Sequence, residues 1–278
     1  CALLSPRSEV LEPACFSVTC VSGLCAIEQA AADLAFRRAD AVLTGGVDAL
    51  TRFMRAGFGS LGALSPSGRL RPFDVEHDGI VIGEAAAFAV LEPAQAGSHR
   101  EVSVLGCVVS QRLVSDAMHL TSPDPEGRGM ARAIAGALRD ACISPEEIGC
   151  ITVTAAGSAV YDRMESRAVL AALGPQAAAR VPVTTWEPAV GHALAATGTL
   201  GVVHAAMVHS DGLVRPVLGV ERVDPDCQLR YVLEGPVPLH SPCVLALTVG
   251  FGGQNGATVV TSLEMAMDLL GRNGEPVR

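Results

Sequence analysis

Aromatic residues are scarce in this 278-residue sequence, which has one tryptophan, two tyrosines and seven phenylalanines. Charged residues make up only 18% of the chain, while 49% of it is hydrophobic. This balance excludes extended disorder and allows a large buried core. Basic residues form no cluster, and the 20 of them are outnumbered by 29 acidic residues. We therefore predict no nucleic-acid partner.

Long apolar runs and paired cysteines are also missing. The run "GIVIGEAAAFAVL" is interrupted by Glu84, and no other run is long enough to span a bilayer, so we predict no membrane partner. The nine cysteines never form a Cys-x-x-Cys pair, and we predict no metal site. Scattered cysteines and the absence of a signal-peptide pattern in the first residues predict reduced thiols in a cytoplasmic protein.

Helix-like and strand-like segments alternate along the chain. A helix is predicted after Cys20, followed by a strand in "DAVLTGGVDAL" and another in "GIVIGEAAAFAVLEP". Residues 93–101 are polar and indicate a linker. After it the alternation restarts and ends in the strand pair "CVLALTVGFGG" and "GATVVTSLE". This order predicts an α/β fold with a largely parallel sheet.

The sequence also contains a weak internal repeat. "CVSGLCAIEQAAADLAF" and "GHALAATGTLGVVHAAMV" are both helices of small residues that open on a reactive side chain. Each precedes a strand that ends in Gly-Gly. Two similar halves, each with one reactive residue at a helix start, would build a single site where the halves meet.

Cys20 ends a β-branched run directly before the first of these helices. A helix N-terminus stabilises a thiolate, which is the form of cysteine that attacks carbonyl carbons. A cysteine considered alone is more often a buried packing residue, and Cys15 and Cys25 keep that interpretation. His192 considered alone is equally well a helix cap.

The order of the motifs decides between these interpretations. "CVSG" is followed by "ADAVLTGGVDAL", "GFGSLGALSP", "RPFDVEHDGIVIGEAAAFAVLE", "SDAMHLTSPDPEG", "VGHALAATGTLG" and "VGFGGQNGATVV". In this order they resemble the motifs of the β-ketoacyl-[acyl-carrier-protein] synthases, condensing enzymes of the thiolase-like fold. The resemblance implies two pseudo-repeated halves in a layered α/β arrangement. Residues 1–96 would form the C-terminal part of an incomplete first half, and residues 97–278 the second half.

The resemblance also implies an acyl-transfer reaction. Cys20 would take an acyl group from the phosphopantetheine thioester of an acyl carrier protein, with no other cofactor bound. The acyl group would then condense with a malonyl thioester, in fatty-acid or polyketide biosynthesis. His192 would act as a neutral donor that stabilises the enolate, and the backbone amides of Cys20 and Phe251 would bind the oxyanion.

Further residues take supporting roles by the same resemblance. Phe251 would also be the aromatic gate of the acyl pocket, and Gly252 would let the backbone approach closely. His119 and Thr121 would line the entrance, although an ordinary loop histidine is an open alternative for His119. Two residues are expected to support the site structurally: Glu84, in an internal hydrogen-bond network, and Asn255, which would hold the glycine-rich loop.

The first departure from the family pattern is a missing histidine. The family places a His-Gly-Thr motif ahead of an Asp-x-x-Glu segment, and Asp162 and Glu165 fit that segment in "TVTAAGSAVYDRMES". Thr154 or Ala156 stands where the histidine belongs, so no imidazole is expected there.

The second departure is a missing lysine five residues before His192, where this chain has Glu187. The acidic partner of that lysine is also missing, since Gly201 occupies its position. Glu187 adds negative charge where an enolate must form. We therefore expect acyl loading to survive while decarboxylation and condensation become very slow.

The third departure is that only nineteen residues precede Cys20, whereas the family has a long region there. Three interpretations follow: an enzyme with impaired turnover, a catalytically impaired partner subunit of a ketosynthase heterodimer that resembles a chain-length factor, and a degenerate remnant. Retention of Cys20 favours the enzyme. An incomplete first half would leave an open sheet edge, which predicts a homodimer or a heterodimer with another ketosynthase-like subunit.

Overall fold

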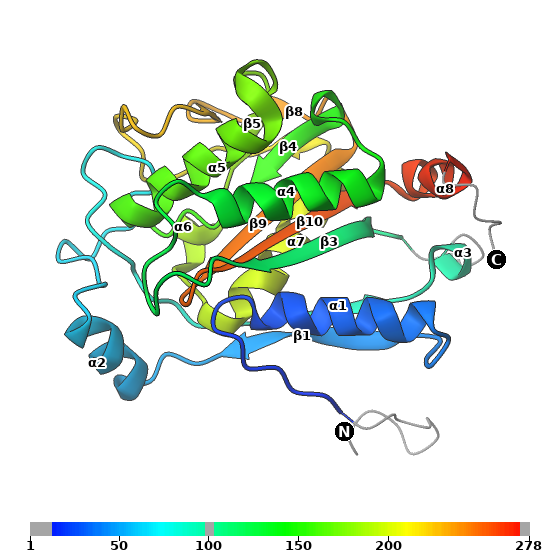
Figure 1. The fold of residues 1–278 in the computed structure, drawn as a ribbon, viewed down its shortest axis with the longest axis horizontal. Coiled ribbons are helices and arrows are strands. Elements are labelled where there is room, and N and C mark those ends of the chain that lie inside the picture. Colours follow the sequence, from blue (N-terminus) through cyan, green and yellow to red (C-terminus); the bar gives the residue numbers. More distant parts are fainter. Residues whose placement is uncertain (1–12, 98–102, 273–278) are drawn as a thin grey trace.

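The computed structural model describes residues 13–97 and 103–272, and its largest element is a six-stranded mixed sheet (Figure 1). The strands lie in the order β3 (Cys107–Ser115), β10 (Gln254–Thr261), β9 (Cys243–Gly250), β4 (Ile148–Thr152), β5 (Pro182–Thr184) and β7 (Arg230–Tyr231). The pairs β3–β10 and β10–β9 are antiparallel, and the remaining pairs are parallel. The carboxyl ends of the parallel strands therefore share one edge of the sheet.

Helices cover both faces of this sheet. Helices α4 (Arg128–Ala141) and α5 (Ala159–Ala178) lie on one face, and α1 (Ser22–Ala35) and α7 (Thr197–Asp211) pack on the other (Figure 1). The strands β1 (Val42–Asp48) and β2 (Ala85–Leu91) form an antiparallel pair that packs against α1 and α7. The layers therefore run helix, sheet, helix, sheet.

Short elements complete the described chain. They are α2 (Arg52–Ser60), α3 (Ala94–Gly97), the 3₁₀ helix η1 (Pro145–Glu147), α6 (Glu187–Val190), η2 (Leu194–Ala196), β6 (Leu213–Val214), β8 (Val237–Pro238) and α8 (Leu263–Arg272). The strands β6 and β8 pair with each other. Within the described residues, no helix has the length and apolar character needed to cross a bilayer.

The sequence explains why these elements pack in layers. All eight residues of β9 are buried, as expected of a strand that helices cover on both faces. In α1 the buried face includes Leu24 and Ile27, which lie on the stripe that the sequence predicts. Helix α7 is rich in small and apolar residues around its axis because it lies between the large sheet and the β1–β2 pair.

The predicted α/β class is confirmed, and its details differ in three places. The second strand of the first half begins at Ala85, because residues 80–83 leave the strand and form isolated bridges elsewhere. Only the four neighbouring strands β9, β4, β5 and β7 pair in parallel with one another. Strand β10 runs antiparallel to β9 because a tight turn connects the two. The predicted linker begins with α3, and its residues 98–101 lie outside the described part of the chain.

Candidate active site

The structure brings Cys20 and His192 together. The Cys20 Sγ and the His192 Nε2 are 3.1 Å apart, although the two residues are 172 positions apart in the sequence. Both are buried, with exposed fractions of 5% and 4%. Cys20 lies two residues before α1, and His192 lies two residues before η2, which leads into α7. Two segments far apart in the sequence therefore hold one thiol and one imidazole in contact.

A tight turn presents Cys20. Thr19 has a φ of 50°, in the left-handed region that non-glycine residues rarely adopt. The Ser22 hydroxyl holds this turn by donating to the Thr19 carbonyl and accepting from the Val18 N–H, at 2.6 and 2.9 Å. The carboxyl end of β9 closes over it, since a Cβ on Gly250 would lie 3.2 Å from the Cys20 backbone nitrogen. Thr19 also donates its Oγ1–H to the Phe251 carbonyl at 3.2 Å.

A segment of the first half positions His192. The His192 N–H donates to the Val81 carbonyl at 2.8 Å, and the Gly83 N–H donates to the His192 carbonyl at 2.9 Å. The two backbone segments lie so close together that a Cβ on Gly83 would lie 2.3 Å from the Val190 carbonyl oxygen. The backbone of residues 80–83 therefore fixes the position of His192. Because this stretch pairs with His192 instead of continuing the strand, β2 starts later than the sequence predicts.

Glu187 is the second partner of His192. Its Oε1 forms a short hydrogen bond with the His192 Nδ1, and its side chain is fully buried. The Glu187 Oε2 has no hydrogen-bond partner among the described residues. Glu187 begins α6, and the four-residue helix turns the chain so that residues 187 and 192 face each other. The arrangement is a line of carboxylate, imidazole and thiol.

Charge within this line favours a protonated imidazole. Burial lowers the pKa of His192, but the Cys20 thiolate and the Glu187 carboxylate outweigh it and raise that pKa well above its usual value. Burial also raises the pKa of Glu187, although His192 opposes that shift. Both shifts keep a proton on the Glu187–His192 pair, which is the form that stabilises a neighbouring thiolate.

No imidazole occupies the position of the missing first histidine. The Thr154 Oγ1 accepts from the Val249 N–H at 3.0 Å and donates to the Leu247 carbonyl at 3.4 Å. Glu165 binds the same loop, because its two carboxyl oxygens accept from the backbone N–H groups of Thr154 and Ala155 at 3.0 and 2.9 Å. Burial raises the pKa of Glu165 to about 8.

Phe251 lies in a cluster of aromatic rings. Its centroid is 5.3 Å from that of Phe58, on α2, and 6.0 Å from that of Tyr161, on α5. The Tyr161 hydroxyl donates to the Thr121 carbonyl at 2.7 Å, which ties the predicted entrance loop to the cluster. Sequence reasoning missed Phe58 and Tyr161. The sequence offers one indication of them: aromatic residues are scarce in the chain, and three of these few residues lie together here.

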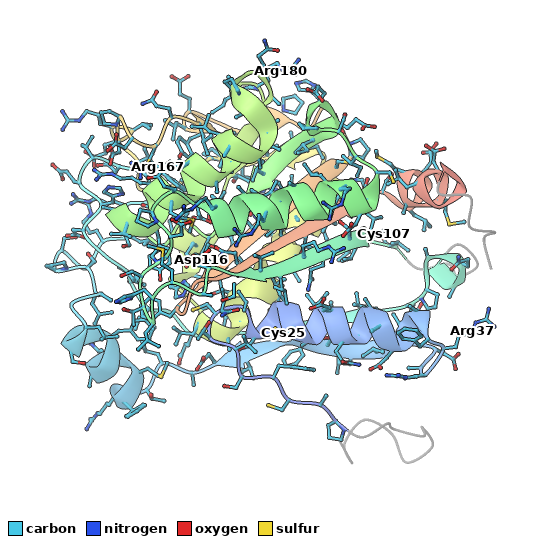
Figure 2. The ribbon with its side chains drawn as sticks, in the orientation of Figure 1. Cys25, Arg37, Cys107, Asp116, Arg167 and Arg180 are labelled. Carbon is cyan, nitrogen blue, oxygen red and sulfur yellow. The ribbon has the colours of Figure 1, made fainter. Side chains whose placement is uncertain are left out.

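The glycine-rich turn after β9 is held from two sides. The Asn255 Nδ2 donates to the Gly253 carbonyl and to the Asp116 Oδ1, both at 2.9 Å. Asp116, which sequence reasoning did not single out, lies in the loop after β3 (Figure 2) and also accepts from the Asp124 N–H at 2.9 Å. Gly252 has a φ of 82°, which requires glycine.

Two predicted residues make hydrogen bonds that involve neither Cys20 nor His192. Glu84 is exposed, and its Oε2 accepts from the Leu50 N–H at 3.0 Å. His119 is exposed as well, and its Nδ1 accepts from the N–H groups of Thr121 and Ser122 at 3.1 and 3.0 Å. His119 therefore binds the backbone of its own loop.

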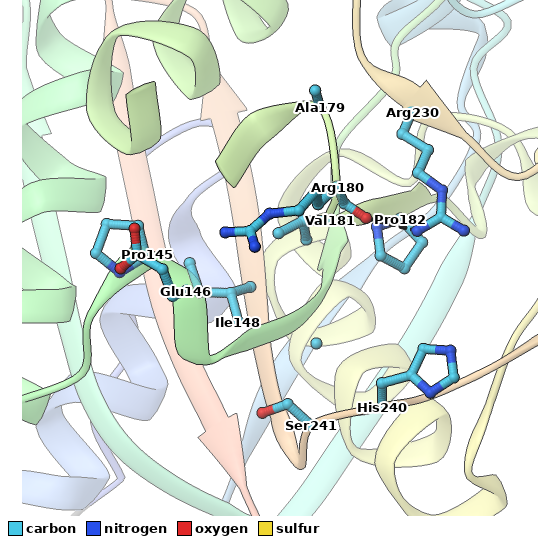
Figure 3. Close-up of a pocket in the computed structure, with 11 residues that line it drawn as sticks. Pro145, Glu146, Ile148, Ala179, Arg180, Val181, Pro182, Arg230, His240 and Ser241 are labelled. Atoms are coloured by element: carbon cyan, nitrogen blue, oxygen red, sulfur yellow. Dashed lines mark hydrogen bonds between the residues drawn. The ribbon is translucent and has the colours of Figure 1, made fainter. Parts of the chain in front are cut away.

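A cavity of about 550 Å³ lies at the opposite edge of the sheet, around the amino ends of β4, β5 and β7 (Figure 3). Arg180, Arg230 and His240 are among the residues that line it. Cys20 lies against the carboxyl end of β9, so this cavity is separate from the cysteine–histidine pair. Within the described parts of the chain, no group of three or more potential ligands could hold a metal ion, and the eight described cysteines form no disulfide.

A layered fold that joins a cysteine and a histidine from two half-folds defines a thiolase-like protein, and the comparisons with known proteins agree. The β-ketoacyl synthase N-terminal domain matches residues 13–96, and the β-ketoacyl synthase C-terminal domain matches residues 105–221. The chain belongs to the β-ketoacyl synthase family.

Curated relatives include two bacterial 3-oxoacyl-[acyl-carrier-protein] synthases 2. The protein from Synechocystis sp. is 34% identical over 247 residues, which cover 87% of this chain and 59% of the relative. That from Coxiella burnetii is 32% identical over 248 residues, which cover 87% of this chain and 60% of the relative. The chain thus spans less than two thirds of the length of either relative.

Solved structures show the same fold. The complex AntDE:AntF, a type II PKS acyl-carrier protein with its ketosynthase bound to the hexaketide, matches with a TM-score of 0.85 at 30% identity, over 89% of this chain and 62% of that one. The ishigamide ketosynthase/chain length factor matches with a TM-score of 0.82 at 29% identity, over 88% of this chain and 60% of that one.

Proposed function

We propose that this chain is an acyltransferase that takes an acyl group from a carrier-protein thioester onto Cys20, in fatty-acid or polyketide biosynthesis. The observation that carries the proposal is the 3.1 Å contact between the Cys20 Sγ and the His192 Nε2. A thiol is weakly nucleophilic until a base removes its proton, and His192 is in position to do so. The carrier protein is inferred from the relatives, whose names include acyl-carrier-protein synthases and a ketosynthase complex with its carrier.

The turn around Cys20 supports the chemistry of loading. A tetrahedral intermediate on the thioester carbon needs N–H donors aimed at its oxyanion. The backbone amides of Cys20 and Phe251 take this role, and the Thr19 hydrogen bond to the Phe251 carbonyl ties the two segments together. The aromatic cluster around Phe251 offers an apolar wall to the acyl chain.

Intact-mass measurement tests the proposal. Incubation of the chain with an acyl phosphopantetheine thioester should add one acyl mass, and Cys20→Ala should remove that adduct. Cys15→Ala and Cys25→Ala should retain it, since neither cysteine contacts an imidazole in the described hydrogen bonds. An adduct that persists in Cys20→Ala contradicts the assignment, as does the absence of any adduct on the unaltered chain.

A partner-subunit role, like that of a chain-length factor, is the second candidate. It is favoured by the absence of the first imidazole, since Thr154 is fully engaged with the backbone of β9. The ishigamide structure among the neighbours pairs a ketosynthase with such a factor. The same mass measurement separates the two candidates, because a partner subunit without chemistry of its own acquires no acyl adduct.

A further inference from the structure

We propose that Cys20, His192 and Glu187 form a catalytic triad that passes the acyl group from Cys20 to an oxygen nucleophile, either water or an alcohol, instead of the carbon nucleophile of a malonyl condensation. The inference depends on the proposed loading of Cys20 and concerns the step that follows it. Three observations carry it: the Cys20–His192 contact, the bond between the His192 Nδ1 and the Glu187 Oε1, and the complete burial of Glu187.

The first step of the argument concerns the two ring nitrogens of His192. An ionised carboxylate can only accept hydrogen bonds, so the Glu187 Oε1 requires the proton of His192 to sit on Nδ1. In the neutral ring Nε2 then presents a lone pair towards the Cys20 Sγ. A lone pair at Nε2 makes His192 a general base. For a neutral His192, stabilisation of a malonyl-derived enolate needs the opposite tautomer, with an N–H at Nε2.

The second step concerns charge. His192 and Asp162 are the charged groups that act most strongly on Glu187, and the unpartnered Oε2 leaves His192 as its main compensation. Such a carboxylate stabilises an imidazolium, which forms when a base takes a proton from water or an alcohol. It destabilises an enolate, which carries a negative charge of its own. The position that holds a lysine in the family pattern therefore favours deacylation by an oxygen nucleophile.

The reaction balances without any further reagent. In loading, the Cys20 thiolate forms a C–S bond to the donor carbonyl, the donor thiolate leaves, and His192 returns the proton to it. In deacylation, the oxygen of water or of the alcohol forms a C–O bond to the acyl carbon, and its proton passes to the His192 Nε2. The Cys20–acyl C–S bond then breaks, and the departing Cys20 thiolate recovers the proton from the His192 Nε2. The product is an acid with water or an ester with an alcohol.

A single-turnover experiment on the full chain tests the proposal. Cys20 is loaded from a short acyl phosphopantetheine thioester, the excess donor is removed, and decay of the adduct is followed by intact mass. Three arms contain buffer alone, added glycerol, and malonyl phosphopantetheine thioester. We expect the adduct to decay in the first two arms, with release of free acid or glycerol ester, much faster than acyl-glutathione in the same buffer. We expect no β-keto product in the third arm.

Glu187→Gln provides the decisive comparison. This change keeps the size of the side chain and removes its charge, and we expect deacylation to slow by roughly 10²- to 10⁴-fold. The matched surface change Glu221→Gln removes a carboxylate whose side chain is 84% exposed, and it should leave the rate unchanged. A melting curve of Glu187→Gln separates a local loss from unfolding.

The pH profile separates catalysis from a purely structural role. Glu187 stabilises the imidazolium that pairs with the Cys20 thiolate, so its loss should move iodoacetamide alkylation of Cys20, read by peptide mapping, to higher pH. An unmoved profile in a folded Glu187→Gln variant overturns the triad. So does an adduct that is stable in buffer and glycerol but is discharged by the malonyl thioester to a β-keto product. Failure to load Cys20 at all overturns the proposed function as well, and is recognised before deacylation is measured.

Discussion

At the scale of single residues, buried carboxyl groups dominate the interior near His192. Glu165, Glu187 and Asp162 are all fully buried and act on one another. Glu165 is satisfied by two backbone N–H groups, whereas Glu187 has only His192. Glu165 and Glu187 are therefore not equivalent: Glu165 holds a loop, and Glu187 orients an imidazole.

Glu165 makes stability depend on pH. Its folded-state pKa is about 8, while an unfolded glutamate titrates near 4.3, so the folded chain retains a proton that the unfolded chain has lost. This contribution to stability is complete below about pH 4.3 and is lost as pH rises through 8, because unfolding then releases a proton. We expect urea unfolding from pH 5.5 to 8.5 to show a steeper loss of stability in the wild-type chain than in Glu165→Gln. Equal slopes would contradict this, and Glu28→Gln serves as the surface control.

At the scale of secondary elements, the site depends on how closely α1 and α7 approach. A Cβ on Gly23 would lie 2.3 Å from the Thr199 Oγ1, and one on Gly198 would lie 2.8 Å from the Leu24 Cγ. Glycine on both helices lets their first turns cross in near contact. This crossing brings the segment before α1, with Cys20, beside the segment before η2 and α7, with His192, which is why two small-residue helices converge on one thiol and one imidazole.

A side chain added between α1 and α7 at their crossing should lower the stability of the fold. We expect Gly23→Ala to lower the free energy of unfolding by roughly 1 to 3 kcal/mol, because the helices must separate to admit a methyl group. Gly57→Ala is the matched control, since Gly57 also lies in a helix but a Cβ added to it would have nothing within 4 Å. That control should be neutral or stabilising by up to about 1 kcal/mol. Urea unfolding of both variants measures the difference, and equal stabilities would refute the crossing argument.

At the scale of the whole molecule, the outer face of the β1–β2 pair is apolar and open. Leu43, Val47, Phe88 and Val90 are 52%, 60%, 54% and 63% exposed. Leu43 lies directly opposite Val90, so these side chains form one continuous surface. Within the described residues, β1 and β2 pair only with each other. Exposed apolar faces with open strand edges beside them are typical of surfaces that associate with another chain.

We therefore expect the chain alone to self-associate through the β1–β2 face. The double variant Leu43→Glu with Val90→Lys places opposite charges in one cross-strand pair, which preserves the strands while removing apolar surface. Sedimentation velocity should show a smaller average mass for this variant than for the unaltered chain. A monomeric unaltered chain that unfolds cooperatively would rule the expectation out.

The sequence predicted the layered α/β class, most strands of the large sheet, and the convergence of Cys20 and His192. These features depend on periodicity and on motifs whose order survives in the chain. It did not predict Phe58 and Tyr161 around Phe251, because those rings come from three distant segments and meet only after folding. It singled out Glu187, five residues before His192, but treated it only as an unfavourable charge.

The sequence by itself determined the family pattern, the cysteine close before a helix, and the small residues that let two helices cross. Only the tertiary structure decided which nitrogen of His192 faces a carboxylate. That choice depends on three local structures: the left-handed turn at Thr19, the backbone pairing of residues 80–83 with the segment that holds His192, and the four-residue helix that begins at Glu187. A tautomer is set by hydrogen-bond direction in three dimensions, and spacing along a chain carries no such direction.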